Sequence, residues 1–189
     1  MTQQLYLPDS NIFIESSRQH YPFDYGEFHA FWQWLERLND SGSIIMLDVV
    51  FNELTTTRRN DSKSKPDFLE TWVMATFTNP VSHKTDEIGE AYSEILDYLN
   101  TCGLYSQDSF RQWTPEDKAD PWLIAAAMTT GATIVTNEVP AHPSRQQQMK
   151  REPKIPDVAA NFEARTINLR EFFDESGLLN KNPYSCHAK

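Results

Sequence analysis

Four acidic residues of this sequence stand where short apolar segments begin or end, which are places where carboxylates can meet to do chemistry. Asp9 follows the first apolar run, Glu138 follows a later one, Asp120 opens an alanine-rich helix and Glu53 lies in a short helical segment. In a sheet of parallel strands, ligands collect outside the carboxyl ends of the strands. We therefore expect the four acids to approach one another at one edge of such a sheet.

Carboxylates that converge in this way need compensation for their charge. Two of them about 5 Å apart repel by roughly 3 kcal/mol at an effective dielectric near 20, so they must be protonated or bound to a cation. None of the five histidines has ligand spacing beside these acids. Oxygen ligands alone favour Mg²⁺ or Mn²⁺ over zinc, and such ions activate water and neutralise charge on a phosphodiester. The pattern indicates hydrolytic phosphoryl chemistry.

Each acid also has a structural interpretation. Asp9 or Ser10 can cap the helix that follows, which is the more common role of an Asp-Ser-Asn sequence. Glu53 can belong to a solvated helix face. Asp157, which follows a proline-rich loop, can add a further acid to the site or serve as a helix N-cap. The functional hypothesis depends on the acids acting together.

The apolar spacing predicts the elements that would position these acids. Short strands are expected at 5–7, 44–47, 132–136 and 165–169. Helices are expected at 28–38, 67–77, 85–99 and from Asp120 or Pro121 to a stop at Gly131. Residues 103–113 are expected to be irregular, and 139–156 to form a long loop. Alternating strands and helices predict a three-layer α/β/α sandwich around a parallel sheet of about four short strands.

Length and composition are those of one globular domain. The chain has 189 residues, and we expect a single domain over 1–178 with a flexible tail at 179–189. Two distant cysteines, no signal segment and no run of roughly 18 apolar residues predict a cytoplasmic protein that does not enter a membrane. The net charge of −10 argues against nucleic acid, although a local patch can have the opposite sign.

Basic residues gather in two segments that follow the proposed acids. They are Arg58, Arg59, Lys63 and Lys65 after Glu53, and Arg145, Lys150, Arg151 and Lys154 after Glu138. Such clusters can grip phosphates, or they can simply keep a surface soluble. Tyr105 and Trp113 are candidates to stack on bases, although aromatic residues are more often part of a core.

Four segments together resemble the PIN-domain pattern. They are LPDSN at 7–11, VVFNEL at 49–54, DPWLIAAA at 120–127 and TIVTNE at 133–138. KIPDV at 154–158, followed by TINL at 166–169, further resembles an uncharacterised bacterial PIN-like group whose relatives include VapC-type toxins of toxin–antitoxin pairs. The resemblance covers most of the chain.

This resemblance implies a metal-dependent endoribonuclease that hydrolyses RNA phosphodiester bonds and is held by a cognate antitoxin, with a homodimer as a further possibility. It implies Mg²⁺ or Mn²⁺ bound by Asp9, Asp120 and Glu138, with Asp157 as an additional candidate, and an attacking water held or deprotonated by Glu53. The residues implied to orient ligands, phosphate or substrate are Asn11, Thr136, Asn137, Arg58, Arg59 and Lys154.

One position departs from the family pattern. Most PIN domains end the Thr-Asn turn with aspartate, whereas this chain has Glu138, whose extra methylene displaces the carboxylate. A PIN-like RNA- or protein-binding module with an impaired site therefore stays open as an alternative. A phosphohydrolase of small phosphoesters is a third alternative, but the chain lacks a GxxxxGK[ST] loop and has only 6 glycines.

Overall fold

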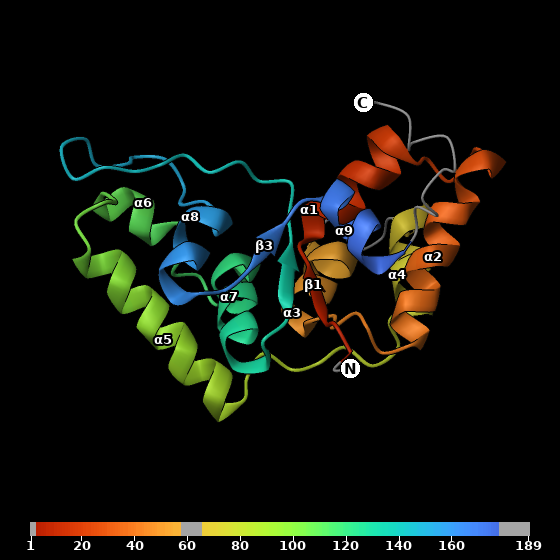
Figure 1. Cartoon of the computed structure of the whole chain (residues 1–189), viewed down its shortest axis with the longest axis horizontal. Helices are drawn as coiled ribbons and strands as arrows, with labels where there is room; N and C mark the ends of the chain where they lie inside the picture. Colours follow the sequence, from red (N-terminus) through yellow and green to blue (C-terminus); the bar gives the residue numbers. More distant parts are fainter. Residues whose placement is uncertain (1–2, 58–65, 178–189) are drawn as a thin grey trace, which may run out of the picture.

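The computed structural model describes residues 3–57 and 66–177, and its centre is a parallel sheet. The sheet contains β1 (Tyr6–Pro8), β2 (Thr133–Val135) and β3 (Thr166–Ile167), hydrogen-bonded in that order. Figure 1 shows helices α5 to α8 on one side of the sheet and helices α2, α4 and α9 on the other. This is the predicted three-layer α/β/α arrangement.

The sheet has one regular strand fewer than expected. The predicted strand at 44–47 forms only isolated parallel bridges, from Ile44 to Tyr6 and from Leu47 to Val81. Its contact with β1 consists of two backbone hydrogen bonds, Tyr6 N to Ser43 O and Ile45 N to Tyr6 O, of 2.9 and 2.8 Å. The chain turns into helix α3 directly after Leu47, so the segment leaves the sheet before a ladder can extend.

The structure contains the predicted helices and several shorter ones. Their bounds are α1 (Ser10–Glu15), α2 (His29–Asp40), α3 (Asp48–Asn52), α4 (Phe68–Thr76), α5 (Asp86–Thr101), α6 (Gln107–Arg111), α7 (Ala119–Thr130), α8 (Ile155–Ala159) and α9 (Leu169–Ser176). The expectation that 103–113 is irregular is wrong, because α6 lies within it. The Ser106 hydroxyl accepts a hydrogen bond from Ser109 N and caps this helix, which is too short to show periodicity.

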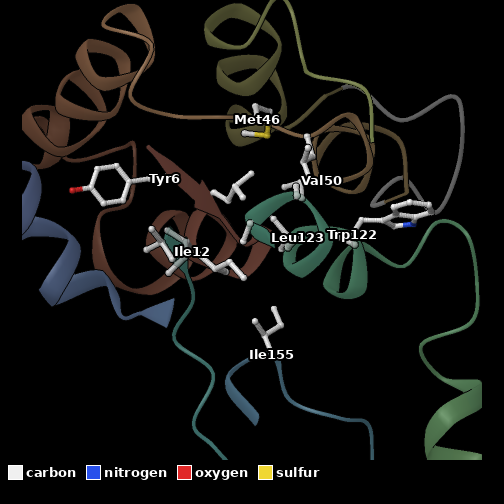
Figure 2. Packing of buried hydrophobic residues seen from close by; sticks show 14 of the residues in the cluster. Tyr6, Ile12, Met46, Val50, Trp122, Leu123 and Ile155 are labelled. Atoms are coloured by element: carbon white, nitrogen blue, oxygen red, sulfur yellow. The ribbon is translucent and has the colours of Figure 1, made fainter. Parts of the chain in front are cut away.

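Helix α7 lies between the sheet and α5 and is buried from Ala119 to Ala127. A helix that is apolar on all sides belongs inside a protein, so α7 forms the centre of its layer. Figure 2 shows Val50 of α3 close to Leu123 of α7. On the outer side, Trp122 of α7 stacks on Tyr92 of α5 with ring centroids 3.7 Å apart. This packing fixes the position of the α7 N-terminus.

Two aromatic residues proposed to contact bases belong to the core instead. Tyr105 is 5% exposed and Trp113 is 0% exposed, so neither ring has a face available for stacking on RNA. The proposal that they stack on bases is wrong, and their burial follows the usual preference of aromatic side chains.

Several predictions lie outside the described residues. The proposed RNA-contacting residues Arg58 and Arg59 and the proposed tail at 179–189 are among them. The single-domain assignment stays a prediction. Within the described ranges, no helix is long and apolar enough to cross a membrane.

Gly131 ends α7 in the left-handed conformation, with φ of 70°, and its N–H donates to Ala127 O. We predict that Gly131→Ala lowers the free energy of unfolding by about 1 kcal/mol, because a β-carbon disfavours this conformation. No atom lies within 4 Å of the added carbon, so the cost is conformational and not a clash. Urea unfolding followed by circular dichroism measures the change.

Gly89→Ala is the matched control, because Gly89 lies inside α5 and its added carbon also meets nothing within 4 Å. Alanine favours a helix interior over glycine by about 1 kcal/mol, so this variant should be more stable than wild type. Equal effects of the two substitutions would contradict the assignment of strain to Gly131.

Candidate active site

Asp9 lies where β1 passes into α1, and it serves as the helix cap considered for it. Its N–H donates to Val135 O at 2.9 Å, which extends the parallel ladder by one residue. Its Oδ1 accepts from Asn11 N at 3.4 Å and caps α1. The side chain is nevertheless only 1% exposed and points into the edge of the sheet, where Oδ2 meets the Thr136 hydroxyl.

Thr136 connects the ends of β1 and β2. Its hydroxyl donates to Asp9 Oδ2 at 3.1 Å and accepts from Glu138 N at 3.2 Å. Because the hydroxyl is buried and has both roles filled, it holds the Asp9 carboxylate and the turn leading to Glu138 in one arrangement. The role predicted for Thr136 in orienting ligands or phosphate stays a prediction.

Asp120 enters the same region from the first turn of α7. Its side chain is largely buried, and Oδ2 lies 3.0 Å from the ammonium of Lys118. The helix begins at Ala119, one residue before the predicted start, and Pro121 occupies the first turn, where its missing N–H has no cost. A carboxylate in the first turn is also favoured by the helix dipole.

Glu53 follows α3 and starts the π-helical turn η3 (Glu53–Thr57). It is half-buried and accepts a hydrogen bond from the Ser10 hydroxyl, which belongs to α1. The solvated helix face considered for Glu53 is therefore wrong. The contact places this carboxylate beside the residue that follows Asp9.

The pKa values of these carboxyls show that they share one environment. Burial raises the pKa of Asp9 to about 6; the Thr136 hydrogen bond opposes this rise, and the charges of Glu138 and Glu53 add to it. Burial raises the pKa of Asp120 to about 7, with Lys118 opposing and Asp9 and Glu138 contributing. Burial also raises the pKa of Glu53, against the Ser10 hydrogen bond, and Asp120 adds to the increase. The structure thus brings together the four predicted acids.

Glu138 has partners on the far side of the long loop. Its Oε1 lies 2.6 Å from Lys154 Nζ, and its Oε2 accepts from Ile155 N at 2.8 Å. Both carboxylate oxygens therefore meet the start of α8. Lys154, predicted to contact substrate, is placed beside the acids by this ion pair.

Asp157 and Asn137 are directed elsewhere. The Asp157 carboxylate accepts from Ala141 N at 2.7 Å and from His142 N at 3.0 Å, which supports the start of the long loop. Asn137 donates to Glu15 Oε2 at 3.0 Å and accepts from Leu169 N at 3.2 Å. Both side chains brace the backbone around the site. Asn11 contributes its backbone N–H to Asp9, and its side chain is exposed.

Lys118, Glu152 and Ser10 also contact the acids or their partners and are not among the predicted site residues. Lys118 lies 3.0 Å from Asp120 and 2.5 Å from Glu152. Burial lowers the pKa of Lys118, but the two carboxylates together raise it above its usual value. Lys118 stands two residues before the predicted ligand Asp120, and this position is a sequence signal for its contact with that ligand. Glu152, within a loop, carries no such signal.

The donor atoms suit a hard divalent cation in their chemistry. Asp9, Asp120 and Glu53 offer only oxygen, and their raised pKa values show that added positive charge would be favourable. The arrangement is not that of a closed ligand shell: in residues 3–57 and 66–177, no group of three or more His, Cys, Asp or Glu is positioned to hold a metal ion. In this structure, lysine ammonium groups provide the neighbouring positive charge.

Comparisons with known proteins agree with the fold. The model of a family described as a domain of unknown function (DUF4411) matches residues 6–179. The crystal structure of VapBC2 from Rickettsia felis bound to a DNA fragment from their promoter is similar with a TM-score of 0.54 at 16% identity, covering 87% of this chain and 98% of that chain. No curated protein matches the sequence. The structural likeness confirms the predicted PIN-like α/β fold.

The raised pKa values predict a dependence of stability on pH. The folded-state pKa of Asp9 lies above its ordinary value of 3.8, so the carboxyl favours folding when protonated. This stabilisation is complete below about pH 4 and is lost as the pH rises through about 6. Ionising Asp9 in the folded state therefore costs on the order of 3 kcal/mol at neutral pH.

In EDTA, we expect Asp9→Asn to be more stable than wild type at neutral pH, with a gain that grows from about pH 4 to about pH 6 and is constant above, because asparagine avoids the buried charge. Urea unfolding at each pH measures the difference. Asp97→Asn, on the exposed face of α5, is the control and should show a difference that is constant with pH. A pH-independent effect of Asp9→Asn would refute the buried-charge explanation.

Proposed function

The chain belongs to the family described as a domain of unknown function (DUF4411), and we propose that it is a Mg²⁺- or Mn²⁺-dependent endoribonuclease. The observation that carries this proposal is the burial of Asp9 and Asp120 beside each other's charge at the carboxyl edge of the sheet. Buried carboxylates whose pKa values are displaced by burial and by one another are typical of functional sites. Their oxygen-only chemistry favours a divalent cation and hydrolysis of a phosphodiester.

In this proposal, Asp9 and Asp120 hold the cation together with Glu138. The ion supplies activation of a bound water and neutralises charge on the phosphate. Glu53 holds or deprotonates the attacking water, because its raised pKa makes it a stronger base than a solvated carboxylate. Ser10 positions Glu53 through its hydroxyl, and Thr136 positions Asp9.

A basic surface on the loop between β2 and α8 supports a nucleic-acid substrate. The loop after β2 passes over α6 and α8 in Figure 1 and lines an open hollow of about 870 Å³. Arg145, Lys150 and Arg151 line this hollow, and all three are exposed. Their positive charge can neutralise phosphates of a bound strand although the whole chain has a net charge of −10. We propose RNA as the substrate, with Lys154, Arg58, Arg59 and Asn11 as further contacts.

We also propose that the protein is the toxin of a toxin–antitoxin pair in the cytoplasm. The PIN-like fold and the likeness to VapBC2 of Rickettsia felis support this biological role. The cognate partner would be an antitoxin protein, and a homodimer is compatible with the same role. Asp157 is also a candidate ligand, but its contacts with the loop backbone favour a supporting role for it.

A binding module without nuclease activity is the second candidate. The contacts of Glu138 favour it, because both carboxylate oxygens are held by Lys154 and Ile155 N. If Glu138 keeps these contacts, fewer carboxylate oxygens are available to bind a cation. RNA binding without cleavage, in the presence of either ion, is the result that would select this candidate.

The nuclease proposal predicts cleavage of RNA by the purified chain with Mg²⁺ or Mn²⁺ and no cleavage in EDTA. Asp9→Asn, Asp120→Asn and Glu53→Gln should each lower the cleavage rate by about 100-fold or more, because each removes a metal ligand or the base. Single-turnover cleavage of a labelled RNA measures the rates.

Asp97→Asn is the matched control, because it removes one exposed acid from the outer face of α5 and should cleave like wild type. Circular dichroism establishes that each variant is folded. The nuclease proposal fails if wild type cleaves no RNA with either metal, or if the site variants cleave as fast as the control.

The basic hollow predicts a dependence of RNA binding on salt. We expect Arg145→Gln with Lys150→Gln to weaken binding and to reduce the slope of log K against log salt by about 0.7 for each phosphate that the protein no longer neutralises. Fluorescence anisotropy of a labelled RNA measures binding. The proteins compared all carry Asp120→Asn, so that cleavage does not interfere with the measurement. An unchanged slope would place the RNA on another surface.

A further inference from the structure

Lys118 contacts two carboxylates that belong to different parts of the fold. Its Nζ lies 3.0 Å from Asp120 Oδ2, in α7, and 2.5 Å from Glu152 Oε1, in the loop before α8. The side chains of Lys118 and Glu152 are 30% and 34% exposed, whereas that of Asp120 is only 13% exposed. Lys118 therefore neutralises a largely buried acid while a more exposed acid holds it from the other side.

We propose that Lys118 is a resident counter-ion that pairs with Asp120 until a divalent cation binds there. Glu152 then keeps the Lys118 ammonium paired after this group has left Asp120. This inference rests on the proposed function, because it requires Asp120 to be a metal ligand. It assigns Lys118 and Glu152 as positioning residues that set the affinity of the site for its ion.

The physical argument is competition for one carboxylate. An ammonium 3.0 Å from Asp120 Oδ2 and a divalent cation on the same oxygen would repel strongly, because their charges would lie within a few ångströms in a poorly solvated place. Two of the proposed ligands are in contact with ammonium groups, Asp120 with Lys118 and Glu138 with Lys154, and among the described residues no group of three or more His, Cys, Asp or Glu is positioned to hold a metal ion.

Glu152 makes the exchange less costly. Removing one partner from a buried ion pair leaves an uncompensated charge, which is strongly unfavourable. Lys118 avoids this state because it already has a second acceptor 2.5 Å away. Glu152 also lies in the loop that carries Arg145 and Lys150, so its ion pair with Lys118 connects the loop to the acidic edge.

The test measures Mn²⁺ affinity of the full chain by isothermal titration calorimetry, without RNA. Lys118→Met should lower the dissociation constant by about tenfold, because Asp120 no longer has to exchange an ammonium. Lys118→Arg keeps the positive charge and should bind Mn²⁺ within about threefold of wild type. Lys84→Met is the matched control, since it breaks the exposed ion pair of Lys84 with Glu116 and should leave the affinity unchanged.

Glu152→Gln should have the opposite effect and raise the dissociation constant by about fivefold, because it deprives Lys118 of its second acceptor. Removing an acid also weakens cation binding through its charge alone, so the double variant is needed. In the Lys118→Met background, Glu152→Gln should have a clearly smaller effect than in wild type. Equal effects in the two backgrounds would overturn the retaining role of Glu152.

The possible results separate this inference from the proposed function. If wild type binds Mn²⁺ and Lys118→Met binds it no more tightly, the counter-ion role is wrong and the nuclease proposal stands. If Mn²⁺ binds as expected but no RNA is cleaved, the nuclease proposal fails and the counter-ion role stands. If neither wild type nor Lys118→Met binds Mn²⁺, both fail. Should Lys118→Met not fold, a Glu152→Gln variant that binds Mn²⁺ at least as tightly as wild type overturns the inference.

Discussion

The burial of Asp9 and Asp120 at the carboxyl edge of a very short sheet is the constraint on which the rest of the site depends. Little water reaches carboxylates in this place, and the protein surrounds them with its own donors. Asp9 has the Thr136 hydroxyl and Asn11 N, and Asp120 has the Lys118 ammonium. These contacts reduce the cost of burial without removing it, as the raised pKa values of both carboxyls show.

Backbone geometry and packing hold Asp9 and Asp120 near each other. Asp9 N donates to Val135 O, so the parallel ladder itself fixes where the first acid stands. Helix α7 is enclosed by the sheet and α5, so its N-terminus has no freedom to carry Asp120 away from the edge. The charge-rich edge is thus held by β1, β2 and α7, whose residues are almost all buried. Local instability at a site supported by a rigid core is typical of sites that bind ligands.

Much of this arrangement follows from local sequence signals combined with one topological rule. Pro8, the last residue of β1, and Gly131, directly after α7, mark element ends, and parallel strands then place Asp9 and Glu138 at the same edge. The bridge made by Lys118 could not be predicted, because Glu152 lies in an aperiodic loop whose position depends on tertiary contacts. Asp157 is the opposite case, because its place in the sequence suits a metal ligand, whereas in the structure its carboxylate accepts hydrogen bonds from two backbone N–H groups of the loop. The segment at 44–47 was apolar enough for a strand, yet an immediate helix start shortened its pairing.

The contacts of Glu138 close the long loop at its base, since one side chain at its start holds Lys154 and Ile155 at its end. The entropy of joining the two ends grows only slowly with loop length, by roughly 0.6 kcal/mol for each doubling. The tip of the loop, near 144–147, can therefore be lengthened or substituted with little effect on the positions of the buried acids. Such a loop is suited to diversification among related chains: it allows recognition to vary while the buried edge of the sheet stays the same.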